Sequence, residues 1–390
     1  MKRTLMRPGM PGGVSTPVVT PIMPSVVYAS DDPDQLDAQY AGEAPGYVYS
    51  REAHPNADVL AAQIDALEGA TGGIVTGSGM AAVAAVLMGL LSAGDHVIGA
   101  DQLYGRSLRM MAEDLPRMGI ATSLADPTDA ANIKAALRPE TRMVIIELVS
   151  NPTLRMADLD GIVALCKENG LLLVVDNTFT TPAAIRPLER GADIVLHSVT
   201  KLLAGHADVT LGWVAARDPA VAERMRIFAV TTGLTASPFD CWLAERGLMT
   251  FDLRFERTQR NAARLADFLA TQPGVARVLY PGRSDHPDAA RAQSLLRGNP
   301  GNMLSFELKG GRGAANAFSR AASGVAFAPT LGDVGTTLSH PASSSHRALS
   351  AEARAKIGIS EGFFRVSVGL EDPEALCETF AAGLNAAGQG

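Results

Sequence analysis

Two polar residues follow apolar runs that have the length of β-strands. Asp176 ends one such run, and Lys201 comes shortly after another, with the hydroxyl groups of Ser198 and Thr200 beside it. If the two strands are neighbours in a sheet, the amine and the carboxylate lie at the same edge. There a lysine can hold an aldehyde as a Schiff base, a buried carboxylate can keep a pyridine nitrogen protonated, and hydroxyls can bind a phosphate. The expected cofactor is therefore pyridoxal 5'-phosphate (PLP).

Each of these residues alone has a simpler explanation. A lysine after a strand can extend its amine into solvent, and Asp176 can cap a helix, as its neighbours Asn177 and Thr178 also could. The combination at short spacing favours the catalytic interpretation.

Two further positions have the chemistry for the same cofactor. Ser78-Gly79-Met80 opens a helix, whose free N–H groups and dipole suit a phosphate. Tyr104 follows a strand that ends near Ala100, where its ring could stack on a pyridine and its phenol could transfer protons. The alternatives are an ordinary turn at Gly79 and a core tyrosine at position 104.

A lone arginine lies inside an apolar strand near the C-terminal end of the chain. Arg365 alternates with apolar neighbours over residues 363–368. A buried guanidinium needs a partner, and the α-carboxylate of a substrate is a natural bidentate one. The alternative is an Asp or Glu of the chain itself.

The elements that must position these residues alternate between strands and helices. Apolar runs occur at residues 96–99, 143–148, 171–175, 194–197 and 211–215, with helical stretches between them. This alternation indicates an α/β fold with a mostly parallel sheet that is covered on both faces. Active residues are then expected at the carboxyl ends of the strands.

The chain of 390 residues suggests roughly two to three domains. We expect a proline-rich N-terminal arm over residues 1–56, a large PLP-binding domain over 57–245 and a smaller α+β domain over 246–390. Residues 240–262 are expected to form one long helix that links the two domains, with Arg254 on its polar side.

Composition excludes several classes of function. The formal net charge of −7 is not that of a nucleic-acid-binding protein. The three cysteines are far apart and show no metal spacing, which is typical of a reducing compartment. Residues 1–8 lack the apolar core of a signal peptide, and no apolar run is long enough for a membrane span. We expect a cytoplasmic protein without a metal site.

The chain resembles the Cys/Met metabolism family of PLP enzymes of fold type I, from about residue 17 to residue 380. This family includes cystathionine γ-synthase, cystathionine γ-lyase, methionine γ-lyase and the O-acylhomoserine sulfhydrylases. The stretches that carry the resemblance are residues 47–51, 77–82, 103–105, 150–152, 175–179, 198–201, 205–206, 237–240 and 365–369.

The resemblance implies a role for each matching residue. Lys201, Tyr104 and Asp176 would be catalytic: Lys201 would bind PLP and move protons, Tyr104 would stack on its ring, and Asp176 would pair with its nitrogen. The remaining cofactor-binding candidates are Gly79, Met80, Asn151, Ser198 and Thr200, together with Tyr49 and Arg51, which would reach the cofactor of a neighbouring subunit. The substrate-binding candidates are Arg365, Thr330 and Arg106.

The sequence departs from the family at the positions that would select the substrate. Methionine γ-lyases usually have a cysteine where this chain has Arg106, and the cystathionine enzymes have a glutamate where it has Gly335. Arg106 could meet a distal carboxylate or could be an ordinary surface arginine. His54 also stands where the family usually has asparagine.

The resemblance implies PLP-dependent γ-elimination from a sulfur amino acid or a γ-substituted homoserine, which releases a 2-oxo acid and ammonia. The alternative within the family is γ-replacement, as in an O-acetyl- or O-succinylhomoserine sulfhydrylase or a cystathionine γ-synthase. From another class, the alternative is a PLP-binding regulator without catalysis. The expected partners are an amino-acid substrate and further copies of the chain in a homotetramer that shares active sites between subunits, with no nucleic acid and no membrane.

Overall fold

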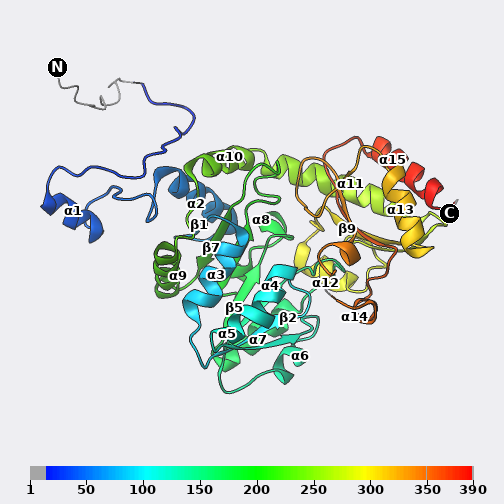
Figure 1. The fold of residues 1–390 in the computed structure, drawn as a ribbon, viewed down its shortest axis with the longest axis horizontal. Coiled ribbons are helices and arrows are strands. Elements are labelled where there is room, and N and C mark those ends of the chain that lie inside the picture. The colour runs from blue at the N-terminus through cyan, green and yellow to red at the C-terminus, as the bar shows by residue number, and fades with distance from the viewer. Residues whose placement is uncertain (1–14, 348, 389–390) are drawn as a thin grey trace.

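A computed structural model describes residues 15–347 and 349–388, which form two sheets with helices packed around them (Figure 1). The expected α/β architecture of fold type I, with a mostly parallel sheet in the large domain and a smaller second domain, is confirmed.

The larger sheet has the strand order β1-β7-β6-β5-β4-β2-β3 in the described part of the chain. Its strands are β1 (Ile74–Thr76), β2 (His96–Ala100), β3 (Ala121–Ala125), β4 (Thr141–Glu147), β5 (Leu172–Asp176), β6 (Ile194–Ser198) and β7 (Gly212–Ala216). Strands β3, β2, β4, β5 and β6 pair in parallel, whereas β7 is antiparallel to both of its neighbours. The central strands are almost wholly apolar and buried, as a sheet covered on both faces requires.

Helices surround this sheet. They are α2 (Pro55–Glu68), α3 (Gly79–Leu90), α4 (Gly105–Arg109), the π-helix η1 (Met110–Asp114), α5 (Leu115–Arg117), α6 (Ala130–Ala135), α7 (Leu159–Asn169), α8 (Thr181–Ala184), the 3₁₀-helix η2 (Pro187–Arg190), α9 (Pro219–Thr232) and α10 (Pro238–Leu248). His54 begins α2: its Nδ1 accepts a hydrogen bond from the Ala57 N–H at 3.1 Å and its Nε2 lies 3.1 Å from the Ala236 carbonyl oxygen. The ring therefore serves as the helix cap.

The smaller sheet has the order β10-β11-β12-β9-β8 within the described residues. Its strands are β8 (Val275–Leu279), β9 (Met303–Leu308), β10 (Ala326–Phe327), β11 (Thr337–Ser339) and β12 (Phe363–Ser367), and its helices are α13 (Gly311–Ala321), the 3₁₀-helix η3 (Pro341–Ser343), α14 (Ala351–Lys356) and α15 (Pro373–Ala387). Helix α12 (Ala289–Leu296) lies between β8 and β9 in the sequence but packs in the large core. Four phenylalanine rings form the centre of this second core, with neighbouring centroids 5.4–6.0 Å apart.

The segment expected to be one helix over residues 240–262 is two. Helix α10 ends at Leu248, and α11 (Phe251–Ala270) starts after Met249 and Thr250. Helix α11 joins the two halves: Phe251 and Phe255 pack in the large core, and Leu265 packs in the small one. The predicted domain boundaries at 56/57 and 245/246 stay predictions.

Arg254 was expected on the polar side of this helix, and the structure places it inside. Its guanidinium donates to the carbonyl oxygens of Leu202, Leu203 and Gly247 at 2.8–2.9 Å. The helix thus holds the chain just after Lys201, and three backbone acceptors compensate the burial of the charge.

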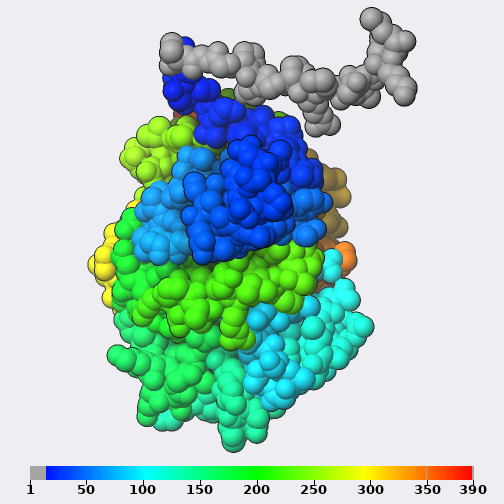
Figure 2. Space-filling view, turned by 90° about the vertical axis from the view of Figure 1, so that its left-hand side faces the viewer, coloured from blue at the N-terminus to red at the C-terminus, as the bar shows by residue number. Residues whose placement is uncertain are grey.

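The described part of the N-terminal arm, residues 15–54, extends away from the large domain (Figure 1). It contains α1 (Pro33–Tyr40) and returns by a bridge between Val27 and Tyr49. Viewed from that side, the segment lies in front of the large domain (Figure 2). Several of its apolar side chains are exposed, namely Val18, Val19, Ile22, Met23, Val26 and Val27. Residues 1–14 of the predicted arm lie outside the described residues.

Candidate active site

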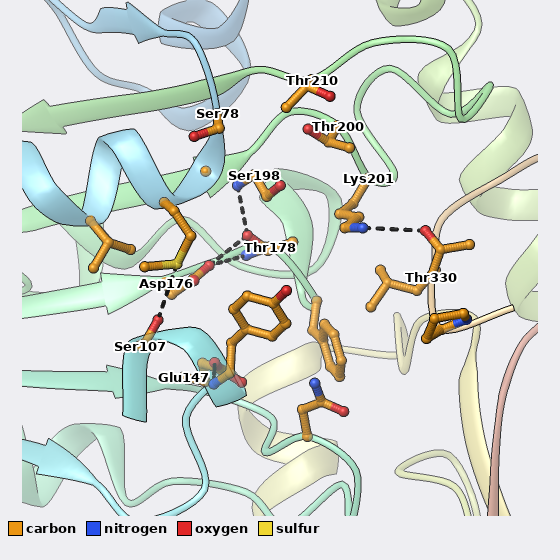
Figure 3. Close-up of a pocket in the computed structure, with 18 of the residues that line it drawn as sticks. Ser78, Ser107, Glu147, Asp176, Thr178, Ser198, Thr200, Lys201, Thr210 and Thr330 are labelled. Carbon is orange, nitrogen blue, oxygen red and sulfur yellow. Dashed lines mark hydrogen bonds between the residues drawn. The ribbon is translucent and has the colours of Figure 1, made fainter. Parts of the chain in front are cut away.

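A cavity of about 230 Å³ lies where the carboxyl ends of the central strands face the small domain. Large-domain strands and loops supply most of its wall, and the small-domain segment with Thr330, Leu331 and Arg365 completes it. Thr330 faces Lys201 across the cavity (Figure 3). Its lining residues are Ser78, Gly79, Met80, Val83, Tyr104, Ser107, Glu147, Asn151, Asp176, Thr178, Phe179, Ser198, Thr200, Lys201, Thr210, Pro329, Thr330, Leu331 and Arg365.

Lys201 follows β6 by three residues and points into this cavity. Its Nζ donates to the Thr330 Oγ1 at 3.2 Å, a contact between the two domains. Burial lowers the pKa of the Lys201 amine from its ordinary value, and the positive charge of Arg365 lowers it further. A lysine in these conditions is more readily neutral, and a neutral amine is the nucleophilic form.

Asp176 lies at the carboxyl end of β5, where the cavity begins. Its Oδ1 accepts hydrogen bonds from the Thr178 N–H at 3.0 Å and from the Thr178 hydroxyl at 2.5 Å. The same hydroxyl accepts from the Ser198 N–H at 2.8 Å, so one threonine ties the ends of β5 and β6 together (Figure 3). Burial raises the pKa of Asp176 above its ordinary value, so a cation beside the carboxylate would stabilise its ionised form.

The N-terminus of α3 opens into the same cavity beside β6. Ser78 caps the helix, because its hydroxyl accepts from the Ala81 N–H at 3.0 Å. The first N–H groups of a helix have no acceptor within it, so those of Gly79 and Met80 are free for an anion. A Cβ at Gly79 would stand 2.7 Å from the Ser198 Cβ, which no real pair of carbons tolerates.

Arg365 lies in the centre of β12 and is 6% exposed. Its two terminal nitrogens donate to the Asn151 Oδ1 at 2.9 Å and to the Thr330 carbonyl oxygen at 2.8 Å. Its Nε is buried without a partner among the described residues. Burial lowers the pKa of Arg365 to about 10, so the guanidinium is still charged at neutral pH.

Tyr104 stands just before α4 and lines the cavity, although 46% of it is exposed in the single chain. Its backbone N–H donates to the Glu147 Oε1 at 2.6 Å. Glu147 is the last residue of β4 and pairs in register with Asp176 across the parallel strands.

The structure brings most of the predicted site residues together around one cavity. They are Gly79, Met80, Tyr104, Asn151, Asp176, Ser198, Thr200, Lys201, Thr330 and Arg365. Tyr49, Arg51 and Arg106 do not line it in the single chain. The guanidinium of Arg51 lies over the Tyr49 ring, 4.9 Å from its centroid, within the arm. Arg106 is exposed on α4, although its neighbour Ser107 lines the cavity.

Sequence reasoning missed several lining residues. Glu147, Ser107, Phe179 and Thr210 were not assigned to the site, and Thr178 was considered only as a possible cap. Glu147 gave a signal, because it is a charged residue that ends the apolar run from Met143, as Asp176 ends the next one. No feature of the sequence indicated Thr210, because its position at the cavity depends on β7 running antiparallel to β6.

Residues 7–385 match the family model of the Cys/Met metabolism PLP-dependent enzymes. The chain belongs to this family. The match spans both sheets and every residue that lines the cavity.

Individual members of the family are similar over most of their length. The cystathionine β-lyase of Bacillus subtilis is 42% identical over 88% of this chain and 87% of its own. The L-methionine γ-lyase of Pseudomonas putida is 38% identical over 95% of this chain and 93% of its own. The crystal structure of cystathionine γ-synthase from Xanthomonas oryzae pv. oryzae in complex with cystathionine superposes with a TM-score of 0.90 at 40% identity, covering 95% of this chain and 94% of that one.

The cavity fits the cofactor of this PLP-dependent family. The close approach of Gly79 to Ser198 leaves a cradle at a helix N-terminus that a side chain would fill, and this cradle suits a phosphate. The buried Asp176 suits a cationic ring nitrogen, and the buried amine of Lys201 suits an aldehyde. The unpartnered Nε of Arg365 is a free donor on the substrate side.

Proposed function

We propose that this protein catalyses PLP-dependent γ-elimination on a sulfur amino acid or a γ-substituted homoserine, releasing a 2-oxo acid and ammonia. One observation carries the proposal: a partly buried lysine amine faces the same cavity as a partly buried carboxylate at a neighbouring strand end and an arginine whose Nε has no partner among the described residues. These groups come from three strands or loops that only the folded chain unites.

The cofactor-binding roles follow from the position of each group. PLP, when bound, supplies an aldehyde for the lysine and a ring that accepts electrons from the substrate. Lys201 is the residue that attaches it, and Asp176 holds the proton of its ring nitrogen. Gly79, Met80, Ser198 and Thr200 hold its phosphate, while Asn151 and Tyr104 flank the ring.

Residues of the small domain orient the substrate. Arg365 binds the α-carboxylate, assisted by Thr330, which also contacts the amine of Lys201. A bidentate arginine fixes both the position and the plane of a carboxylate. The reacting carbons are thereby held beside Lys201.

Proton transfer falls to two residues. The neutral amine of Lys201 removes the proton from Cα, passes that proton on and, neutral again, removes the proton from Cβ. The phenol of Tyr104 donates a proton to the departing γ group. With water, the overall products are the 2-oxo acid, ammonia and the protonated γ group, so that atoms and charge balance.

The charged groups around the cavity favour a γ group without charge. Among the described residues, the ionisable side chains of the lining are Glu147, Asp176, Lys201 and Arg365. The last three have the roles given above and Glu147 accepts a hydrogen bond from the Tyr104 N–H, so none of the four is left for a distal ammonium or carboxylate. Val83, Leu331 and Phe179 provide apolar surface instead. A thioether or a small ester suits this cavity better than the charged distal end of cystathionine.

The alternative function is γ-replacement. Its support is the similarity to a solved cystathionine γ-synthase and the presence of Arg106 on α4, one residue before a lining residue. A sulfhydrylase acting on an O-acetyl or O-succinyl ester would use the same Lys201 and Tyr104, with a thiol in place of water.

The exposed apolar arm supports an assembly of several copies. We propose a homotetramer of two dimers in which Tyr49 and Arg51 of one subunit complete the phosphate site of another. None of the described helices has the length and the apolar character that crossing a bilayer demands. We propose a cytoplasmic location with amino acids, not nucleic acids or membranes, as ligands.

The discriminating experiment is a product analysis. Purified protein is incubated with methionine, cystathionine, O-acetylhomoserine and O-succinylhomoserine, each with and without sulfide. The proposal expects 2-oxobutanoate from an uncharged γ-substituted substrate without sulfide. A strict need for sulfide, with homocysteine as the product, would establish the replacement reaction instead.

A further inference from the structure

A second buried carboxyl group, that of Glu147, lies beside Asp176 at the edge of the cavity. Glu147 ends β4 and pairs in register with Asp176 on β5. Register partners in parallel strands point to the same face of a sheet, and both side chains line the cavity (Figure 3). Glu147 is 8% exposed, and the proposed reaction assigns it no role.

The contact that Glu147 makes is to the backbone of Tyr104. Its Oε1 accepts from the Tyr104 N–H at 2.6 Å, across 43 positions of sequence. Tyr104 begins α4 but offers that helix no side-chain cap, and its own side chain is 46% exposed. Little else fixes the phenol within the chain, so its place depends on how its backbone is held.

We propose that Glu147 is a positioning residue: its carboxyl group anchors the Tyr104 backbone and thereby holds the phenol at the cavity wall. The inference rests on the proposed function, because it gives Glu147 its role through the tyrosine that donates the proton. The anchor joins the end of β4 to the start of α4, so that Tyr104 and Asp176 keep a fixed separation.

The charges around Glu147 determine the form in which it acts. Burial and the neighbouring Asp176 raise the pKa of Glu147 well above its ordinary value, whereas the Tyr104 amide and the charge of Arg365 oppose this rise. Lys201 is the other cationic side chain that lines the cavity. The raised pKa favours the protonated form of Glu147, whose oxygen still accepts the amide N–H, and glutamine offers the same acceptor without a charge.

The test compares E147M, which fills a similar volume without an acceptor, with E147Q, which keeps one. The exposed Glu140 directly precedes β4, and E140M is the matched control. The readouts are hydrogen exchange of the Tyr104 amide in the PLP-bound protein, the PLP dissociation constant, and kcat and KM separately. A double-mutant cycle with Y104A then shows whether Glu147 acts through the tyrosine.

The proposal expects the Tyr104 amide to exchange about tenfold faster in E147M and kcat to fall about three- to tenfold, which is the value of one hydrogen bond. In E147Q, both the exchange rate of the Tyr104 amide and kcat should return most of the way to the wild-type values. In the Y104A background, E147M should lower kcat no further. E140M should behave as the wild type.

Contrary results are equally definite. The positioning role would be overturned if the Tyr104 amide exchanged as slowly in E147M as in the wild type. It would also be overturned if the kcat losses of E147M and Y104A multiplied in the double variant, or if E147Q lost as much kcat as E147M. If E147M does not fold, an unprotected Tyr104 amide in the wild type would overturn the proposal by itself. A wild type that binds no PLP would instead refute the proposed function.

Discussion

At the scale of single residues, the amine of Lys201 is the centre of the site. It is partly buried, it contacts Thr330 at 3.2 Å, and Arg365 acts on it as a like charge. Both effects lower its pKa, so the neutral form is reached at a lower pH than for a free lysine. The pH at which the protein reacts with an aldehyde therefore depends on Arg365.

Arg365→Gln removes this charge and should raise the pKa of Lys201. The rate at which cofactor-free protein takes up PLP should then rise with pH at a higher midpoint than in the wild type. The measurement is the pH profile of that rate, followed by absorbance. Arg260→Gln, which changes an exposed arginine of α11, is the control. An unshifted or lowered midpoint would show that Arg365 does not act on the amine.

The sequence was sufficient to place Lys201 and Asp176 at the same edge of the sheet, because strand-end positions in a parallel sheet converge. It did not reveal Glu147 as a lining residue, since one carboxylate after an apolar run could equally face solvent. Whether it turns inward is decided by the register of β4 with β5. Arg365 was predicted to need a partner, and the partners in the chain are an amide oxygen and a carbonyl oxygen, not a carboxylate.

At the scale of elements, the start of α3 is fixed by its contact with the end of β6. Gly79→Ala would place a Cβ 2.7 Å from the Ser198 Cβ and 3.0 Å from its Cα. We expect the PLP dissociation constant to rise at least about tenfold, because helix and strand must separate where the phosphate binds. Equilibrium binding to the cofactor-free protein measures it.

Gly313→Ala is the matched control, since a Cβ there has open space around it in α13. It should leave PLP affinity unchanged and raise the free energy of unfolding by about 0.5–1 kcal/mol. Equal PLP affinity in Gly79→Ala and the wild type would show that the phosphate does not bind at this helix.

Helix α11 also holds the segment that follows Lys201. Arg254→Met should leave the carbonyl oxygens of Leu202 and Leu203 without their side-chain donor, whereas that of Gly247 keeps the Thr250 N–H. We expect the free energy of unfolding to fall by about 2–4 kcal/mol, because each buried unpaired acceptor is costly. Denaturant unfolding measures this, with Arg260→Met as the exposed control. A loss below about 0.5 kcal/mol would contradict the structural role.

The elements predicted from apolar runs are found within one or two residues, as for β5 and β6. Strand β3 was missed, because its residues Ala121–Ala125 are partly exposed at the sheet edge and lack a continuous apolar run. The break at Met249 and Thr250 was missed because neither residue is a strong helix breaker. The sequence around Arg254 does not indicate that it is buried, since two of its acceptors, Leu202 and Leu203, lie about fifty residues earlier in the chain.

At the scale of the whole molecule, the cavity lies between two cores that α11 connects. Its cofactor-binding side comes from the large domain and its substrate-binding side from the small one. The topology of the small sheet could not be predicted, because its strands pair mostly antiparallel over long separations and one strand, β10, has only two residues.

The arm gives a prediction for the assembly. If Tyr49 and Arg51 complete the site of a neighbouring subunit, Lys201→Ala and Arg51→Ala chains should each be nearly inactive but should complement each other when co-expressed. Random pairing gives half mixed dimers with one intact site each, hence about a quarter of wild-type activity. The specific activity of the unfractionated co-expressed protein is the measurement.

Lys201→Ala paired with Asp176→Ala is the control for this complementation. Both residues line the cavity of their own chain, so no mixed dimer has an intact site, and no activity should return. An active site shared through the arm would be contradicted if activity returned in the control pair. It would also be contradicted if no activity returned when Lys201→Ala was co-expressed with Arg51→Ala.

The central claim is that the amine of Lys201 is the group that binds the cofactor aldehyde. The most direct measurement is reduction of the PLP-loaded protein with borohydride, followed by digestion and mass spectrometry. We expect a pyridoxyl phosphate adduct on the peptide that contains Lys201, and no such adduct in Lys201→Ala. An adduct on another lysine, or none at all with PLP bound, would contradict it.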